Sequence, residues 1–351
     1  MKKRIAVVPG DGIGIEVTRE AVKVLSAVAQ AGGHDFDLVE FDWGAGRYLR
    51  DRVSLPEGAL EQLRRDFDAI LLGALGDPRA PDTSYMRDIL FGLRFGLDLY
   101  ANIRPVKLLH PSLTPLRNCA AIDLVIFREN TEGLYAGVGG NFKKGTADEV
   151  AVQEDVNTYK GVERILRAAF DYARASGRKR LVMSDKSNAL TYGHGLWQRL
   201  FAALAPQYPE VESRHLLVDN LALQMVRDPT QFDVIVTCNL FGDILSDLGA
   251  ALVGGLGVAP SGNVNPEGIS MFEPVHGSAP DIAGKGIANP LGAILAAGML
   301  LDHLDLKQGS VWVEQAVRAS LDAGKTTADL GGRLKTSDVG DWVANHIAAR
   351  G

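Results

Sequence analysis

The sequence has 351 residues, of which 46% are hydrophobic, so the chain can bury a large core and is long enough for two domains. Its formal net charge of −6 argues against a nucleic-acid or membrane-surface partner, because both attract clustered positive charge. Cys119 and Cys238 lie far apart without nearby metal-ligand partners, so neither a disulfide framework nor a zinc site is indicated. The N-terminal apolar run is too short for a signal peptide and no apolar segment is long enough to span a membrane, which predicts a cytoplasmic protein.

The first predicted strand, residues 4–9, leads into a glycine-rich turn, VVPGDGIGIEV (7–17). A dinucleotide fingerprint has glycine at the first, third and sixth places of its turn, with an acidic residue about 20 positions later. Gly10 and Gly12 fit the first two places, but Ile15 stands at the sixth and the next acidic residues come later than the fingerprint expects. The turn alone therefore indicates a tight strand-to-helix connection.

Short aliphatic runs alternate with helical patterns along the rest of the chain. Apolar residues at three- and four-residue spacing predict helices over 15–31 and 161–176. Strands are predicted over 4–9, 67–75, 123–127, 180–185 and 233–238. This alternation indicates an α/β fold with a largely parallel sheet. The glycine-rich segment 132–156 breaks the alternation and predicts a protruding β arm.

A helix predicted after Cys238 carries two carboxylates one turn apart, Asp243 and Asp247. Its apolar residues are expected to form the opposite, buried face: Phe241, Ile244, Leu245, Leu248 and Leu252. The aspartates could simply face solvent, yet like charges four residues apart repel by a few tenths of a kcal/mol. A divalent cation such as Mg²⁺ or Mn²⁺ would reverse that penalty.

Three arginines and a possible acid/base pair lie near predicted strand ends. Arg94, Arg104 and Arg128 could each be an ordinary surface residue, but together they make a plausible clamp for carboxylates. Lys186 directly follows a predicted strand, which makes it a candidate acid/base, and Tyr135 lies in the arm segment. Without further context, packing or solvation is the better explanation of both residues.

The segment MFEPVHGSAPDIAGKGIANP, residues 271–290, supplies the missing context. Together with PGDGIGIEV, RENTEGLYAG, KSNAL and NLFGDILSDL, it closely resembles the β-decarboxylating dehydrogenase family over about residues 4–300. This family includes isopropylmalate, isocitrate, homoisocitrate and tartrate/D-malate dehydrogenases. The resemblance implies two α/β halves that share a mixed sheet, a fold distinct from the Rossmann domain. It also implies a homodimer with shared active sites, a cofactor-side domain over 1–99 and 253–351, and a substrate and dimerisation domain with the β arm over 100–252.

The resemblance also implies roles for particular residues. It assigns Asp219, Asp243 and Asp247 to a Mg²⁺ or Mn²⁺ ion, with Asp219 supplied by the partner subunit. Substrate binding falls to Leu90, Arg94, Arg104 and Arg128, and catalysis to Tyr135 and Lys186, the lysine again from the partner. NAD binding falls to Ile13, Glu273, His276, Gly277, Ser278, Ala279, Asp281, Ile282 and Asn289. The implied reaction is the metal-dependent oxidative decarboxylation of a 3-substituted malate, a 2-hydroxy acid with a β-carboxylate.

Substrate and cofactor preference are expected to depend on a few of these positions. NADP-using members carry a Lys-Tyr pair where this chain has Asp281 and Ile282, so NAD is expected. Ile89, Leu90 and Phe91 are expected to offer an apolar surface, which favours 3-isopropylmalate, the substrate of the leucine-biosynthesis member.

Other members of the family remain as alternatives. Arg87 stands where isopropylmalate enzymes often have an acidic residue, and SGNVNPEGISMFEPVHG is closer to the tartrate/D-malate members. Tartrate/D-malate dehydrogenase is therefore the first alternative, followed by homoisocitrate and isocitrate dehydrogenases. An inactive binding paralogue is the non-enzyme alternative, although none of the matched positions is lost.

Overall fold

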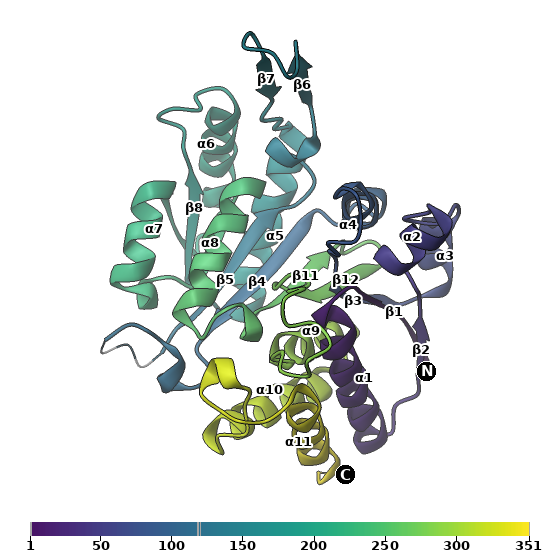
Figure 1. The fold of residues 1–351 in the computed structure, drawn as a ribbon. Coiled ribbons are helices and arrows are strands. Elements are labelled where there is room, and N and C mark those ends of the chain that lie inside the picture. The colour runs from purple at the N-terminus through teal and green to yellow at the C-terminus, as the bar shows by residue number, and fades with distance from the viewer. Residues whose placement is uncertain (1, 118, 120, 351) are drawn as a thin grey trace. The chain divides into compact units, whose positions relative to one another are not determined.

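The computed structural model describes residues 2–117, 119 and 121–350, and the chain forms two compact units (Figure 1). Unit 1 contains residues 1–99, 107–121 and 250–351, and unit 2 contains residues 100–106 and 122–249. In the described part of the chain, no helix is long and apolar enough to cross a membrane. Short 3₁₀ turns occur at Pro111–Leu113, Leu134–Ala136, Ala205–Gln207, Pro229–Gln231, Leu256–Val258 and Ala328–Leu330.

Unit 1 has a mixed sheet with strand order β2-β1-β3-β12-β11. Its strands are β1 (Lys3–Gly10), β2 (Phe36–Glu40), β3 (Ala69–Ala74), β11 (Pro260–Val264) and β12 (Ser270–Pro274). β1 runs parallel to β2 and β3, and β3 runs parallel to β12, whereas β11 and β12 are antiparallel. The predicted α/β class with a mixed sheet is confirmed.

Alternate residues of β1 face two different cores of unit 1. Ile5 and Val7 pack among residues of α1 (Ile13–Gly32), α9 (Leu291–His303), α10 (Lys307–Asp322) and α11 (Thr336–Ala348). Ala6 and Val8 instead pack with α2 (Ala45–Asp51), α3 (Ala59–Asp66) and α4 (Ser84–Gly96). Because side chains alternate along a strand, helices cover both faces of this sheet, as Figure 1 shows.

Residues 107–121 join unit 1 through polar contacts with α10. Lys107 Nζ lies 2.8 Å from both carboxylate oxygens of Glu314, and Arg318 donates a hydrogen bond of 2.9 Å to the carbonyl of Leu109. Arg318 Nε also donates to Glu314 at 3.0 Å. These half-buried ion pairs tie the segment to a helix that comes some 200 residues later.

Unit 2 has strand order β4-β5-β10-β8-β9, in which β5, β10, β8 and β9 are parallel. The strands are β4 (Ala101–Lys107), β5 (Asp123–Glu129), β8 (Arg180–Asp185), β9 (Glu212–Leu217) and β10 (Val234–Thr237). Its helices are α5 (Tyr159–Ser176), α6 (Gly193–Leu204), α7 (Val218–Arg227) and α8 (Asn239–Leu252). The strands and helices predicted from periodicity are all present.

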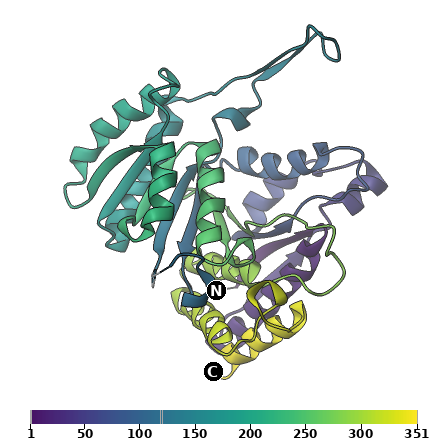
Figure 2. The ribbon, with the colours of Figure 1, turned by 60° about the vertical axis from the view of Figure 1, so that its left-hand side comes forward.

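The predicted arm is a two-stranded antiparallel hairpin, β6 (Gly139–Phe142) and β7 (Val150–Gln153). It extends from the helices of unit 2, as Figure 2 shows clearly. Phe142, Val150 and Val152 are 65%, 51% and 45% exposed, so the hairpin carries apolar side chains that this chain does not cover. A hairpin of two strands is only marginally stable on its own.

The apolar face predicted for α8 is wrong at Ile244, which is 58% exposed, whereas Leu245 and Leu252 are buried. The face that packs within unit 2 is marked by glycines. A Cβ on Gly242 would lie 2.5 Å from Arg128 Cβ, and one on Gly249 would lie 2.6 Å from Val106 Cγ2. Close approach of the helix to β4 and β5 therefore sets its orientation, and this places Ile244 on the outer side.

Candidate active site

Unit 2 brings five of the predicted site residues into one cluster. Tyr135 donates a hydrogen bond of 2.8 Å to Asp243 Oδ2, and Arg128 donates to Asp243 Oδ1. Arg104 Nη1 lies 3.3 Å from Asp243 Oδ1 and 3.7 Å from Asp247 Oδ1. The cluster therefore holds two carboxylates of α8 against two guanidinium groups and a phenol.

Buried contacts fix the two arginines of this cluster. Arg128 is 1% exposed, and its Nε and Nη2 donate to Asn239 Oδ1 at 2.9 and 2.7 Å. Its guanidinium carbon also lies 5.2 Å from the centre of the Tyr135 ring. Arg104 is 6% exposed and donates to Ser246 Oγ at 2.6 Å. Both charges are thus preorganised, so an anion that binds here need not order them.

The two carboxylates of α8 fit a hard divalent cation. The side chains of Asp243 and Asp247 are 37% and 56% exposed, so both can be reached from solvent. Burial raises the pKa of Asp247, and the neighbouring Asp243 raises it further, whereas Arg104 and Arg128 lower it, so a bound cation would favour the ionised form of this carboxyl group. Oxygen donors of this kind suit Mg²⁺ or Mn²⁺.

No group of three or more His, Cys, Asp or Glu side chains that could hold a metal occurs within residues 2–117, 119 and 121–350. Asp219 lies instead in the first turn of α7, where its Oδ1 accepts a hydrogen bond of 2.9 Å from Lys186 Nζ. That hydrogen bond lowers the pKa of Asp219. The two residues expected to serve the partner's site are therefore paired with each other.

In unit 1, Arg94 Nη2 lies 3.0 Å from Glu273 Oε1, which also accepts a 2.8 Å hydrogen bond from Asn263. Arg94 is 6% exposed, and its Nε is buried without a hydrogen-bond partner among the described residues. A buried donor without a partner costs about 1–3 kcal/mol, which a bound carboxylate would recover. Arg94, predicted to bind substrate, and Glu273, predicted to bind NAD, thus lie side by side.

The apolar surface predicted on α4 is partly wrong, because Ile89 is 0% exposed and belongs to the core of unit 1. Leu90 and Phe91 are both half-buried and can line a pocket. Phe91 stacks on Phe95 with ring centres 5.5 Å apart. Successive helix residues point about 100° apart, so a run of three apolar residues cannot all face one side.

The glycine turn after β1 packs against the predicted cofactor loop. The Ile13 backbone N–H donates to the Ser278 carbonyl at 2.8 Å, and a Cβ on Gly12 would lie 2.1 Å from that same oxygen. Gly12 has a φ of 57°, and Ala279 has a φ of 38°, which is unusual for a residue with a side chain. Close backbone approach, and not a phosphate cradle, explains the glycine at this position.

The other predicted cofactor residues follow in the same loop. Asp281 and Gly277 are exposed, and burial lowers the pKa of His276, whose Nε2 is buried without a hydrogen-bond partner in the described residues. Asn289 is buried: its Oδ1 accepts from the Leu291 N–H at 3.0 Å, and its Nδ2 donates to Asp329 at 2.9 Å. The Asn289 amide therefore joins the start of α9 to the 3₁₀ turn at Ala328–Leu330.

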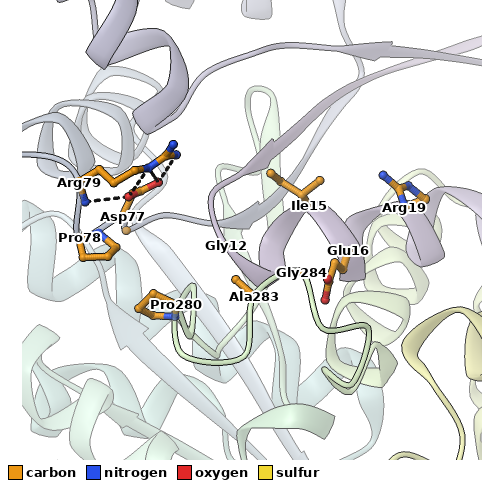
Figure 3. Close-up of a pocket in the computed structure, with 11 residues that line it drawn as sticks. Gly12, Ile15, Glu16, Arg19, Asp77, Pro78, Arg79, Pro280, Ala283 and Gly284 are labelled. Carbon is orange, nitrogen blue, oxygen red and sulfur yellow. Dashed lines mark hydrogen bonds and ion pairs between the residues drawn. The ribbon is translucent and has the colours of Figure 1, made fainter.

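A pocket of about 540 Å³ lies beside this loop in unit 1 (Figure 3). Gly12 lines it from the glycine turn, Ile15, Glu16 and Arg19 from α1, residues 76–79 from the loop after β3, and Pro280, Ala283 and Gly284 from the cofactor loop. Arg79 Nε lies 3.0 Å from both oxygens of Asp77 on one side of the pocket. Asp281 and Ile282 come between the lining residues Pro280 and Ala283, so the pocket borders the two positions on which the expected NAD preference depends.

Asp11 is a residue that the sequence reasoning missed. It is 4% exposed, and its carboxylate accepts hydrogen bonds from the Ala45 N–H at 2.7 Å, the Gly76 N–H at 2.9 Å and the Tyr85 hydroxyl at 2.8 Å. Burial next to this carboxylate raises the pKa of Tyr85. Asp11 thus joins the glycine turn, the pocket wall and α4. An acidic residue between two glycines was the only signal in the sequence.

Comparison with known proteins places this chain in a family. The family model described as isocitrate/isopropylmalate dehydrogenase matches residues 4–343. The 3-isopropylmalate dehydrogenase of Thermobifida fusca is 47% identical over 99% of this chain and 98% of its own. The 3-isopropylmalate dehydrogenase of Streptomyces coelicolor is 49% identical over 98% of both. The chain therefore belongs to the isocitrate/isopropylmalate dehydrogenase family, and it is a dehydrogenase.

A solved structure agrees with this assignment. The crystal structure of isocitrate dehydrogenase from Methylococcus capsulatus matches this chain with a TM-score of 0.89 and 37% sequence identity, covering 99% of both chains. The fold is thus shared between members named for different substrates, so the fold alone does not select a substrate.

Proposed function

We propose that this protein is an NAD-dependent 3-isopropylmalate dehydrogenase, an enzyme of leucine biosynthesis in the cytoplasm, with Mg²⁺ or Mn²⁺ as its metal. The observation that carries the proposal is the cluster of Arg104, Arg128, Tyr135, Asp243 and Asp247, which combines carboxylate-binding cations, metal-binding oxygens and a proton donor. The high identity to two bacterial 3-isopropylmalate dehydrogenases over nearly whole chains supports the substrate.

The roles of the side chains follow from their chemistry. Asp243 and Asp247 would hold the divalent cation, which would supply a Lewis acid for the oxygens of the substrate, and NAD would supply the hydride acceptor. Arg94, Arg104 and Arg128 bind the substrate carboxylates through paired hydrogen bonds. Lys186, supplied by the partner subunit, takes the 2-hydroxyl proton. Tyr135 returns a proton to the carbon that has lost carbon dioxide.

The apolar residues of α4 favour 3-isopropylmalate over a tricarboxylate. Leu90 and Phe91 would leave a third carboxylate without a partner, at a cost of several kcal/mol. An isopropyl group gains about 2 kcal/mol from the same contact. With Ile89 buried in the core, this selectivity depends on Leu90 and Phe91.

The proposed cofactor preference depends on Asp281. Its exposed carboxylate can accept hydrogen bonds from the 2′-hydroxyl of an adenosine ribose and would repel a 2′-phosphate. The pocket beside Pro280 and Ala283 offers space next to this position. NAD is therefore favoured over NADP.

A homodimer is part of the same proposal. The two carboxylates of α8, Asp243 and Asp247, and the Lys186–Asp219 pair are separate groups within unit 2. In a dimer, the carboxylates of one chain would form a site with the Lys186–Asp219 pair of the other. Apolar side chains on this unit are exposed, including Leu223 at 54%, Ile244 at 58% and Phe142 at 65%. A dimer that covers these residues removes their apolar surface from water.

The dimer is tested by light scattering and by complementation. Lys186→Ala and Asp243→Asn proteins, each expected to be inactive, are mixed and refolded together. In a hybrid dimer one of the two sites is then intact, so activity should return. Proven hybrid dimers without activity would show that each chain carries a complete site.

The substrate is tested by kcat/KM with NAD and Mg²⁺ for 3-isopropylmalate, D-malate, tartrate, isocitrate and homoisocitrate. We expect 3-isopropylmalate to be preferred, and Leu90→Ala to lower its kcat/KM about 10-fold while D-malate changes little. D-malate is the matched control because it lacks the group that Leu90 contacts. A preference for either tricarboxylate would refute the apolar-pocket argument, and a lack of turnover with every substrate would favour an inactive paralogue.

A further inference from the structure

The backbone of Lys186 is held at a fixed position by hydrogen bonds on both sides. Its N–H donates to His194 Nδ1 at 2.8 Å, and its carbonyl accepts from the N–H groups of Ala189 and Leu190 at 2.9 and 2.8 Å. The preceding residue, Asp185, is 1% exposed and accepts from the Ser187 N–H at 2.9 Å. Only the Lys186 side chain, which now reaches Asp219, can move without breaking these contacts.

The contact with His194 requires one form of the imidazole ring. Because Nδ1 accepts the Lys186 N–H, it carries no proton, and the proton of a neutral ring lies on Nε2. His194 is 1% exposed, and burial lowers its pKa, so the neutral ring is favoured. A protonated Nδ1 would face a second donor and lose the hydrogen bond.

His194 also links this lysine to the helix that carries the metal pair. Its ring packs edge to face on Phe241, with ring centres 5.5 Å apart, and Phe241 lies in the first turn of α8. Its Nε2 faces Asp155 Oδ2 at 3.6 Å, and that carboxylate accepts a 2.9 Å hydrogen bond from Asn157. The ring is thus held from three sides while it holds the lysine backbone.

We propose that His194 is a positioning residue, which fixes where the side chain of Lys186 is presented by accepting its backbone N–H. This proposal rests on the proposed function, in which Lys186 takes the substrate proton. Misplacing a reacting group by about 1 Å can lower a rate by about 10²-fold. Loss of the His194 acceptor should therefore lower kcat far more than it weakens substrate binding.

Three variants test the proposal. His194→Leu replaces the imidazole with an apolar side chain of similar size that has no hydrogen-bond acceptor, whereas His194→Asn retains an oxygen near the position of Nδ1. His346→Leu is the control, because His346 is a half-buried histidine that stacks on Trp342 in unit 1. We expect His194→Leu to lower kcat about 10- to 100-fold with KM changed less than about 3-fold, and His194→Asn to recover most of the loss.

Amide hydrogen exchange gives a readout that does not depend on turnover. The Lys186 N–H should exchange faster in His194→Leu than in the wild type or in His194→Asn, while the core strands keep their protection. If the wild type turns over no substrate, the proposed function fails, and exchange at Lys186 still tests the His194 contact. Folded Leu and Asn variants with equal kcat, or with equal exchange at Lys186, would overturn the proposal.

Discussion

Replacing Gly12 by alanine should weaken cofactor binding through the loop at Ser278. The new Cβ would lie 2.1 Å from the Ser278 carbonyl oxygen and 2.9 Å from its Cβ, and real Cβ contacts are essentially never below 3.0 Å. The loop must therefore move by about 1 Å, which can change the binding or reaction of a positioned group by up to about 10²-fold. It must also stretch or break the hydrogen bond from the Ile13 N–H.

Gly33→Ala is the control for a glycine with a positive φ and no clash. Gly33 has a φ of 63° and a ψ of 31°, and no atom lies within 4 Å of the position that its Cβ would take. Gly33→Ala should lose about 1 kcal/mol of stability from its left-handed backbone. Gly12→Ala should lose more, because its φ of 57° and ψ of −129° fall in a region that residues with a side chain avoid. Only Gly12→Ala should also raise the KM for NAD, by about 10-fold or more.

The assay is NADH titration by fluorescence, together with KM for NAD and thermal unfolding of each variant. KM for 3-isopropylmalate serves as an internal reference, because the Ser278 loop is not expected to contact that substrate. Equal NAD affinity in the wild type and in Gly12→Ala would refute the argument that the glycine turn sets the position of the cofactor loop. Weakened NAD binding in Gly33→Ala, which has no clash, would refute the claim that the clash with Ser278 is the cause of the effect in Gly12→Ala.

Three further predictions concern the metal, the cofactor and pH. Activity should be lost in excess chelator and return with Mg²⁺ or Mn²⁺. The Asp243→Asn variant should be folded but nearly inactive. Full activity in excess chelator would contradict the proposed metal site. Asp281→Lys combined with Ile282→Tyr should move the kcat/KM preference from NAD toward NADP, and an unchanged preference would reject the role of Asp281. Burial lowers the pKa of His303 in the folded protein. As the pH drops below about 6.5, the unfolded chain therefore takes up a proton at this residue more readily than the folded chain, and the free energy of unfolding should fall. His303→Phe should lessen that fall in urea unfolding between pH 7.5 and 5.5, whereas an identical pH dependence would rule out His303 as a cause.

Local patterns were sufficient to predict several strands and helices of this fold. The predicted strands over residues 4–9 and 180–185 correspond to β1 and β8, and the helix over 15–31 corresponds to α1. Such elements depend on hydrophobic period and on turn residues, which are properties of neighbouring positions in the sequence. The arm over 132–156 was recognised for the same reason, because its glycines and alternating residues break the helical period.

Contacts between distant segments could not be predicted in this way. Asp11 accepts hydrogen bonds from residues 34, 65 and 74 positions away, and no local pattern links an aspartate with those donors. The approach of Gly12 to Ser278 likewise joins segments that lie 266 positions apart in the sequence. The family resemblance named the residues of the cofactor loop, but the glycine that shapes the loop became evident only from its backbone contacts.

Two isoleucines show why an apolar pattern cannot tell which face of a helix is covered. Ile89 was expected at a pocket and is fully buried, whereas Ile244 was expected in the core and is 58% exposed. In α8 the inward face is set by Gly242 and Gly249, whose lack of side chains lets the helix approach β4 and β5. Ile244 lies two positions after Gly242, which is about 200° around the helix, so its side chain is turned outward. In this chain the outward residue lies one position from Asp243, so the surface that a second subunit would cover adjoins the carboxylates that a shared active site would use.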